Sequence, residues 1–447
     1  MTADAEAGEK SPSKAPEAVG FWDPALKTTR NKVFFKWGRT ALLLCTFILC
    51  VLSLYWAVQF HSDDKVSNLK VWVVDFDNSQ DALVGPAVTD LARQISTSSQ
   101  SKQNLGYTIK PATDFEDPVA VVQAVYDEHC WAAIIVNPDA TTLLRDAVTN
   151  GNTSYSPSDA AQFVIISARD ETTFSSYITP ALNSFELQLR ASFGPEWVRN
   201  LTTSSTTNFT SIPPQAINPA IAFNTLDLRP FAPAAATPSV TIGLIYLIIL
   251  SFFNFPFMMP VHGMFMKPNE NGKTLKIPQW LIWRVCSSIT TYFFLSLFYS
   301  FVSLAFQIPF SNDPAPDTVS ANNPNAYGKG SFVVFWMLNW VGMGALGFPL
   351  ENMSMILGFP YSALFLIFWV ITNVSSGFYA LDIAPGFFKW GYAWPLHRIV
   401  NALRTILFGT HSKIGLDFGV LFAWIGASLI LFPFATFIMR WKMKRGI

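Results

Sequence analysis

Long apolar runs recur along the chain and are separated by polar stretches. A helix needs about 20 residues to cross a hydrocarbon core about 30 Å thick. Six runs are long enough, and they lie near residues 39–60, 239–260, 285–307, 331–350, 360–381 and 418–439. The pattern therefore predicts an α-helical polytopic membrane protein with six transmembrane helices.

The segment between the first two runs has a different pattern, in which short β-branched stretches alternate with helical ones. Strands are expected at 69–75, 106–110, 131–136 and 162–168, and helices near 84–98, 117–129, 139–149 and 172–200. Strands that alternate with helices imply an α/β domain. Residues 201–238 are rich in Ser, Thr, Asn and Pro, a composition that favours a stalk without a core. We therefore expect an α/β domain with this stalk at 61–238, inserted between helices 1 and 2, and a five-helix membrane domain at 239–447.

The composition agrees with a membrane protein. Of the 447 residues, 51% are hydrophobic and only 13% are charged, whereas an ordinary soluble domain has about 25% charged residues. The formal net charge is zero, so the charge gives no reason to expect a nucleic-acid partner. The four cysteines show neither a metal-binding spacing nor a disulfide framework.

The basic residues predict the orientation in the membrane. Fifteen Lys and Arg lie in the N-terminal tail and its flank, the 261–284 loop and the C-terminus, whereas the loops on the other side hold five. By the positive-inside rule both termini are cytosolic, and residues 61–238 are extracellular or lumenal. Residues 1–38 are then a disordered cytosolic tail. Three glycosylation sequons fall in the outer segment, at Asn152, Asn200 and Asn208.

A cluster of three aspartates follows the first expected strand. Asp75 and Asp77 have the Asp-x-Asp spacing of haloacid-dehalogenase-type phosphatases, and Asp81 comes shortly after. That chemistry also needs a lysine and a magnesium ion held by further carboxylates. The segment has no lysine after Lys110, and its spacing does not match a calcium loop. We therefore expect the aspartates to cap backbone amides at the strand end, with contact to a ligand or metal as the alternative.

No other motif predicts a catalytic, cofactor or metal site, and we do not expect an enzyme. Residues 342–347 read GMGALG, but they lie inside an apolar run and no acidic residue follows at the dinucleotide-binding distance. These glycines are expected to let helices approach closely. Glu351 falls at the inner end of a run, so no carboxylate is expected in mid-membrane to carry protons.

An amphipathic helix is expected near 395–408, before the last run. Its sequence WPLHRIVNALRTILFG begins with a proline suited to a first turn and ends at a glycine. The helix is too short to span, and two arginines in mid-bilayer would cost roughly 5 to 7 kcal/mol. We expect it in the outer interface or re-entering partway, with its polar face acting as a gate or contacting lipid headgroups; the alternative is a face that meets only water. The polar face holds His397, Arg398, Asn401 and Arg404, together with Thr405.

The chain resembles a known family in the order of its parts and in three stretches of sequence. These are VVDFDN followed by VGPAV, then WAAIIVNPDATTLLRDAV, then APGFFKWGYAWPLHRIVNALRTILFG. Over about 36–445 the chain is similar to fungal nitrosoguanidine-resistance membrane proteins, and through them to permease subunits of type-2 ABC exporters and bacterial phage-infection-type membrane proteins. The resemblance implies a permease-like plasma-membrane protein tied to tolerance of toxic compounds.

Two functions fit these features. One is a permease-like component that contributes to export of, or resistance to, toxic compounds; the other is a non-transporting regulator of membrane lipid distribution or protein trafficking. Because the chain has no ATPase domain, the resemblance implies a separate ATPase subunit as a partner, besides the lipid bilayer and a second copy in a homodimer. The segment KIPQWLIWR, in the 261–284 loop, is expected to form an interfacial coupling helix that reaches the ATPase.

Overall fold

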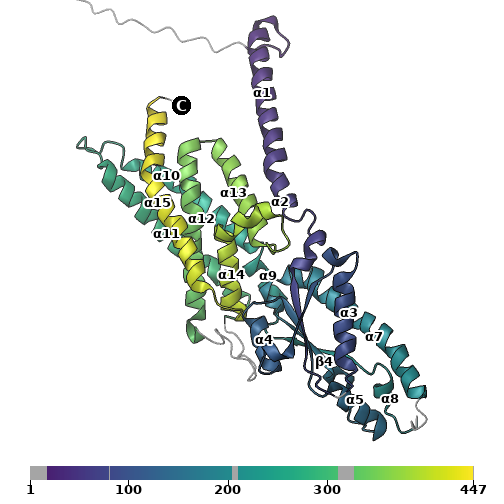
Figure 1. Ribbon diagram of the computed structural model, residues 1–447. Coiled ribbons are helices and arrows are strands. Elements are labelled where there is room, and N and C mark those ends of the chain that lie inside the picture. The colour runs from purple at the N-terminus through teal and green to yellow at the C-terminus, as the bar shows by residue number, and fades with distance from the viewer. Residues whose placement is uncertain (1–17, 80, 204–209, 311–326, 446–447) are drawn as a thin grey trace, which may run out of the picture. The chain divides into compact units, whose positions relative to one another are not determined.

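The computed structural model describes residues 18–79, 81–203, 210–310 and 327–445 (Figure 1). The chain divides into two compact units, of which the first ends at Ser53 and the second is Leu54–Ile447. The first unit holds the apolar helix α1 (Lys27–Phe47), and η2 (Ile48–Leu52) and the short α2 (Ser53–Ala57) follow it. The second unit holds everything else, including the sheet and the remaining long helices.

Five of the described helical segments are long and apolar enough to cross a membrane, so the chain is a polytopic membrane protein in outline. They are Pro24–Ala57, Ala234–Met264, Ile277–Ala305, Gly328–Leu357 and Ile414–Lys444. The run expected at 360–381 forms α13 (Tyr361–Gly377), an apolar helix of 17 residues that falls short of the usual spanning length. The helix ends early because the residues after Gly377 leave it and pack beside the sheet.

A five-stranded sheet forms in the order β2-β1-β3-β4-β5, and every neighbouring pair is parallel except β3 and β4. On one face of the sheet α3, α5 and α7 bury a core around Val71, Val73 and Ile134, and on the other α4 packs over Val74 and Ile135. Successive strand residues thus face opposite sides, as a two-residue period requires. The elements are β1 (Lys70–Asp75), α3 (Val84–Thr97), β2 (Gly106–Lys110), α4 (Pro118–Tyr126), β3 (Ala132–Val136), α5 (Ala140–Thr149), β4 (Ala161–Ile165), α6 (Glu171–Thr173), α7 (Thr179–Thr203) and β5 (Phe223–Asp227).

The fifth strand lies inside the segment that the composition assigned to a stalk without a core. Residues 210–228 instead add α8 (Pro214–Ile217) and β5, and β5 pairs with β4 at the edge of the sheet. Apolar side chains outside the Ser/Thr run explain the difference, because Ile212, Ile221 and Phe223 are buried in the same core as the other strands. We call residues 63–228 the sheet domain and residues 234–445 the helical domain.

The helical domain is arranged around α12 (Ser331–Leu357), which contacts α10 (Gly243–Met264), α11 (Ile277–Ala305), α13, α14 (Pro395–Phe408) and α15 (Ile414–Lys444). Its glycines allow this close packing. A Cβ on Gly342 would lie 2.8 Å from Ile399 Cδ1, and one on Gly347 would lie 2.3 Å from Tyr292 Oη. The prediction that GMGALG serves helix packing is therefore confirmed.

A buried ion pair joins α11 to α12. Arg284 donates to Glu351, and both side chains are at most 2% exposed. Ser288 also donates to Glu351 (3.3 Å), and the rings of Trp280 and Phe432 each lie 4.9 Å from the Arg284 guanidinium. The sequence-based placement of Arg284 in a loop was wrong, because the expected coupling helix KIPQWLIWR is the beginning of α11. Glu351 lies near the end of α12, and the prediction did not foresee that it is enclosed there by a partner. The local sequence pattern does not reveal an ion-pair partner that lies on another helix.

We expect loss of one member of this pair to be more damaging than loss of both. Glu351→Leu leaves the Arg284 charge buried without a counter-ion, which should cost about 3 to 5 kcal/mol. The double variant Arg284→Met with Glu351→Leu should recover most of that loss, because no buried charge remains. Thermal unfolding of the purified protein in detergent measures both effects. Additive losses in the double variant would show that the two groups are not coupled.

Candidate functional site

The polar face of α14 lines a cavity, and the sequence explains how the helix comes to present it. Pro395 occupies the first turn, and Gly409, with φ 71°, ends the helix in the left-handed region, as predicted. The apolar residues of the helix, such as Ile399 and Leu403, are fully buried. They pack against α12, α13 and α15 instead of against lipid. His397, Asn401 and Arg404 of α14 are therefore turned toward the cavity.

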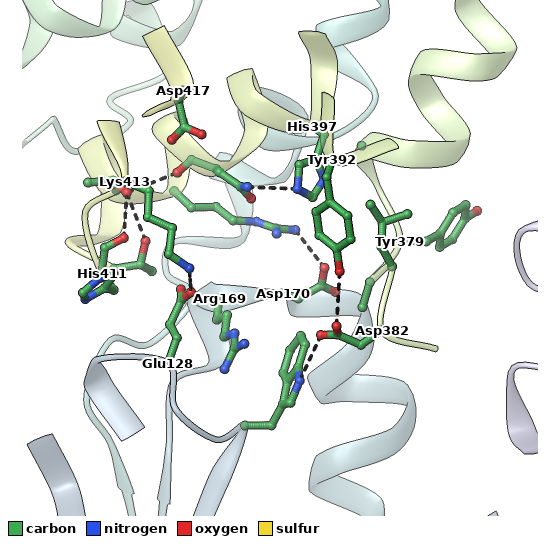
Figure 2. A pocket seen from close by; sticks show the side chains of 18 residues that line it. Glu128, Arg169, Asp170, Tyr379, Asp382, Tyr392, His397, His411, Lys413 and Asp417 are labelled. Carbon is green, nitrogen blue, oxygen red and sulfur yellow. Dashed lines mark hydrogen bonds and ion pairs between the residues drawn. The ribbon is translucent and has the colours of Figure 1, made fainter. Parts of the chain in front are cut away.

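The cavity has a volume of about 260 Å³ and is formed by both domains (Figure 2). We call it the boundary pocket. From the sheet domain it is lined by Glu128, Trp131, Arg169 and Asp170. From the helical domain it is lined by Gly377, Tyr379, Ala380, Leu381, Asp382, Tyr392, His397, Asn401, Arg404, Thr405, Thr410, His411, Lys413 and Asp417.

Two ion pairs across the boundary pocket connect the domains. Arg404 Nη2 lies 3.2 Å from Asp170 Oδ2, and Lys413 is paired with Glu128. Asp170 has a second role, because its Oδ1 accepts from the Thr173 amide (2.8 Å) and so caps α6. Burial alone raises the pKa of Glu128, but the positive groups around it outweigh burial and hold that pKa below its ordinary value. These groups are Arg169, Lys413 and His411.

The backbone at the end of α14 is also held by the sheet domain. The Gly409 carbonyl oxygen accepts from Tyr126 Oη (2.9 Å) and from Arg229 Nε (3.1 Å). A helix C-terminus leaves carbonyl groups without intrahelical partners, and here Tyr126 of the sheet domain and Arg229, directly after that domain, satisfy one of them. Helix α14 is thus fixed at its end as well as along its polar face.

His397 is a neutral, fully engaged side chain. Its Nδ1–H donates to the Ser376 carbonyl oxygen (3.0 Å), which can only accept, and its Nε2 accepts from Asn401 Nδ2 (3.2 Å). Burial lowers the pKa of His397 to about 4, and Arg398 and Arg404 act in the same direction, against the Ser376 carbonyl and the Asp170 carboxylate. The imidazole therefore positions Asn401 and carries no charge at neutral pH.

An aromatic wall with residues from both domains completes the pocket. The Arg169 guanidinium stacks on Trp131, 3.8 Å from the ring centroid, and donates to the Cys130 carbonyl oxygen (2.8 Å). Asp382 accepts from Trp131 Nε1 (3.2 Å) and Tyr392 Oη (3.3 Å). Burial and the Asp382 carboxylate raise the pKa of Tyr392 to about 12, so its hydroxyl keeps its proton.

The predicted polar face is thus only one side of the site. His397, Asn401 and Arg404 line the boundary pocket, whereas Arg398 stands behind it and donates to Asp417 Oδ1 (3.4 Å). Sequence reasoning missed the sheet-domain lining altogether. Trp131 directly precedes β3 and Arg169 lies in the short turn after β4, where nothing in the local pattern distinguishes them from ordinary boundary residues.

The aspartates after β1 lie away from the boundary pocket, because they follow the carboxyl end of β1 whereas Trp131 precedes the amino end of the parallel β3. Asp77 accepts from the amide and hydroxyl of Thr141, and Thr141 Oγ1 in turn accepts from the Leu83 and Val84 amides at the start of α3. Asp75 Oδ1 accepts from the Asp77 amide (2.9 Å). The Asp81 carbonyl oxygen accepts from Arg145. The Asp77 and Thr141 contacts therefore cap the starts of α5 and α3, Asp75 stabilises the turn after β1, and the Asp81 side chain makes no capping contact among the described residues.

Within the described residues no group of three His, Cys, Asp or Glu side chains could hold a metal ion. Of the three sequons, Asn200 is exposed on α7 and Asn152 is half-buried, with its Nδ2 donating to Asp146 Oδ2 (3.1 Å). Asn208 lies outside the described residues.

Comparison with known proteins places the chain in a family. Residues 40–430 match the family described as "Protein of unknown function (DUF3533)". The chain belongs to this DUF3533 family. It is also similar to the uncharacterized endoplasmic reticulum membrane protein YJR015W of Saccharomyces cerevisiae, with 27% identity over 453 residues that cover 96% of this chain and 85% of that protein. No solved structure matches the chain.

The match covers both domains of this DUF3533 chain, from within α1 to within α15. Sheet and helical domains, and hence both walls of the boundary pocket, therefore belong to one family unit. The relative is named as an endoplasmic reticulum protein, whereas the sequence predicted the plasma membrane.

We expect His397 to make the stability of this DUF3533 protein fall in mild acid. Because the folded-state pKa of about 4 lies below the ordinary value of 6.5, the unfolded chain binds the proton more readily between these pH values. The stabilising contribution is complete above pH 6.5 and is lost as the pH falls toward 4. His397→Gln should flatten this part of the curve of melting temperature against pH, whereas the matched change at exposed His61 should not. Identical curves for wild type and His397→Gln would exclude a buried neutral imidazole.

Proposed function

We propose that the protein is a permease-like membrane protein that holds the polar part of amphipathic compounds in the boundary pocket and contributes to their export, or to resistance against them. The observation that carries the proposal is the enclosure of a charged helix face, α14, by a second domain at the end of the membrane helices. A polar pocket continuous with apolar helices suits a compound with a polar head and an apolar body. Because the His397 nitrogens are both engaged, the proposal includes no catalytic step.

The cross-domain ion pairs give the pocket a way to open. Separation of the sheet domain from α14 would expose Arg404 and Asp170 to water, where each is well solvated, so the cost of opening is moderate. The Lys413–Glu128 pair, whose lysine is 45% exposed, should add little to the closed state, since solvent compensates for its loss. The Arg404–Asp170 pair is only 11% and 5% exposed and should hold the closed state more firmly. We propose that the predicted gate is this interface and not α14 alone. Energy for transport would come from a separate ATPase subunit, acting on a homodimer.

For the location we propose a membrane of the secretory pathway, either the endoplasmic reticulum or the plasma membrane. Both termini are proposed to be cytosolic, with the sheet domain on the lumenal or extracellular side. The predicted distribution of basic residues supports this orientation, and so does the position of the three sequons.

Glycan analysis tests the orientation. Treatment with an endoglycosidase should increase the gel mobility of the protein, and Asn200→Gln should reduce that shift because its side chain is exposed on α7. Asn373→Gln provides the control, since the further Asn-Val-Ser sequon at 373–375 begins at a fully buried asparagine beside α14 and should carry no glycan. An unchanged mobility of the wild type on digestion would contradict a lumenal sheet domain.

A transport test decides whether the protein exports compounds. Cells that lack it should accumulate a labelled nitrosoguanidine or an amphipathic fluorescent dye faster than cells that express it. Glu128→Gln removes one cross-domain pair and should weaken the protection severalfold, whereas Asp90→Asn, which breaks an exposed pair on α3, should protect like wild type. Equal accumulation with and without the protein would reject export.

The second candidate is a non-transporting regulator of membrane lipid distribution or protein trafficking. It is favoured by the tight joining of the two domains, since sheet and helical domains form one compact unit with shared core residues such as Ala380 and Ile383. A scaffold needs that rigidity, whereas a transporter must give it up during each cycle. Unchanged accumulation together with an altered surface lipid distribution in cells lacking the protein would select this candidate.

A further inference from the structure

Two charged groups in the boundary pocket each have one atom without a partner among the described residues. Asp417, on α15, is fully buried; its Oδ1 accepts from Arg398, but its Oδ2 accepts from nothing. Arg404 uses Nη2 for Asp170, while its buried Nε–H donates to nothing. A buried charged group that lacks a hydrogen bond loses the hydration it had in water. Both side chains line the same cavity, and the two atoms themselves are covered just beneath its surface.

One of the two atoms needs a hydrogen-bond donor and the other needs an acceptor. A carboxylate oxygen accepts only, so the group facing Asp417 has to carry an N–H or O–H and is favoured if it is positive. A guanidinium nitrogen donates only, so the group facing Arg404 has to accept and is favoured if it is negative. The rest of the lining has both signs too, with Arg169 and Lys413 against Glu128 and Asp382. A ligand with a single charge would give one of the two atoms a hydrogen-bond partner and leave the other without one.

We propose that the boundary pocket binds a small zwitterion that carries a primary ammonium group and a phosphate or carboxylate group. On binding, the two side chains turn toward the cavity, so that the ammonium donates to Asp417 Oδ2 and the anion accepts from Arg404 Nε. A quaternary ammonium has no N–H to donate, so the pocket discriminates against choline-type ligands. The volume of about 260 Å³ lies at the lower end of ligand pockets, which suits a headgroup-sized molecule. The inference deepens the proposed function, because it names the polar head that the pocket holds.

The same chemistry occurs in soluble zwitterions and in lipid headgroups, and binding assays separate the two. The purified full-length protein in detergent is titrated by calorimetry with O-phosphoethanolamine, with O-phosphocholine, and with short-chain phosphatidylethanolamine in the same micelles. We expect O-phosphoethanolamine to bind about tenfold or more tightly than O-phosphocholine, since one charged hydrogen bond is at stake. A tighter lipid arm identifies a membrane lipid as the source, and binding of the soluble arm alone identifies a soluble zwitterion; both support the proposal.

Two variants test the assigned atoms. Asp417→Asn keeps an acceptor for Arg398 but turns a donor toward the ammonium, so the preference for the primary amine should disappear. Arg404→Lys keeps a positive charge beside Asp170 but removes Nε–H, so both phosphate ligands should bind several times more weakly. Asp90→Asn and Arg93→Lys, at an exposed pair on α3, make the same chemical changes away from the pocket and should bind like wild type.

Three outcomes would overturn the proposal. They are the absence of binding by every zwitterion into the millimolar range, equal binding of the two phosphate esters, and an unchanged preference in folded Asp417→Asn. If Asp417→Asn does not fold, the Arg404→Lys titration decides, because unaltered phosphate binding there contradicts the assigned anion contact. Binding is measured without transport, so a protein that binds the zwitterion but fails the accumulation test loses only its export function.

Discussion

Arg404 and Asp170 lie 234 positions apart in the chain, and their ion pair is the contact on which the arrangement of the two domains depends. The opposite face of α14 is enclosed by the helical domain, so the Arg404 guanidinium can reach a counter-ion only on the side of the sheet domain. A charge removed from water without a partner costs several kcal/mol, which is comparable to the whole stability of many domains. The sheet domain supplies the partner, Asp170. A second ion pair between the domains, Lys413 with Glu128, lies nearby. The boundary pocket is the space that these matched charges enclose.

The helical domain also contains a buried ion pair, but this pair is shielded from water more completely. Arg284 and Glu351 are more deeply buried than any boundary pair, and aromatic rings cover the guanidinium instead of solvent. Such a pair can be reached only if α11 and α12 lie close together, and Gly347 makes that possible by leaving room for Tyr292. A fully enclosed pair adds little net stability, but it penalises any shift of one helix along the other. We infer that the Arg284–Glu351 pair fixes the axial register of α11 against α12. The ion pairs at the boundary pocket are more exposed to solvent.

The sequence predicted the parts of the fold that depend on local patterns. The four expected strands and the α14 boundaries were recovered because alternation, a first-turn proline and a terminal glycine act over a few residues. The strand β5 was missed because Phe223 follows a stretch whose average composition is polar, although a few apolar residues are enough for an edge strand. The predicted helix at α13 was too long because the residues after Gly377 are still apolar. In the structure these residues pack on the sheet domain instead. Arg284 with Glu351, and Trp131 with Asp382, were beyond reach because each pair joins distant segments.

Asp417 connects the boundary pocket to a membrane-spanning helix. It lies in the first turn of α15, where the helix dipole favours a negative charge, and it already shares Oδ1 with Arg398 of α14. An ammonium group at Oδ2 would compete for the same carboxylate charge and so weaken its attraction to Arg398. Arg404, six residues further along α14, would at the same time share its charge between Asp170 and the bound anion. A zwitterion would therefore weaken the ion pairs of α14 with both neighbours together. A ligand with one charge would weaken only one of these contacts, so weakening both together would require recognition of both ends of the ligand.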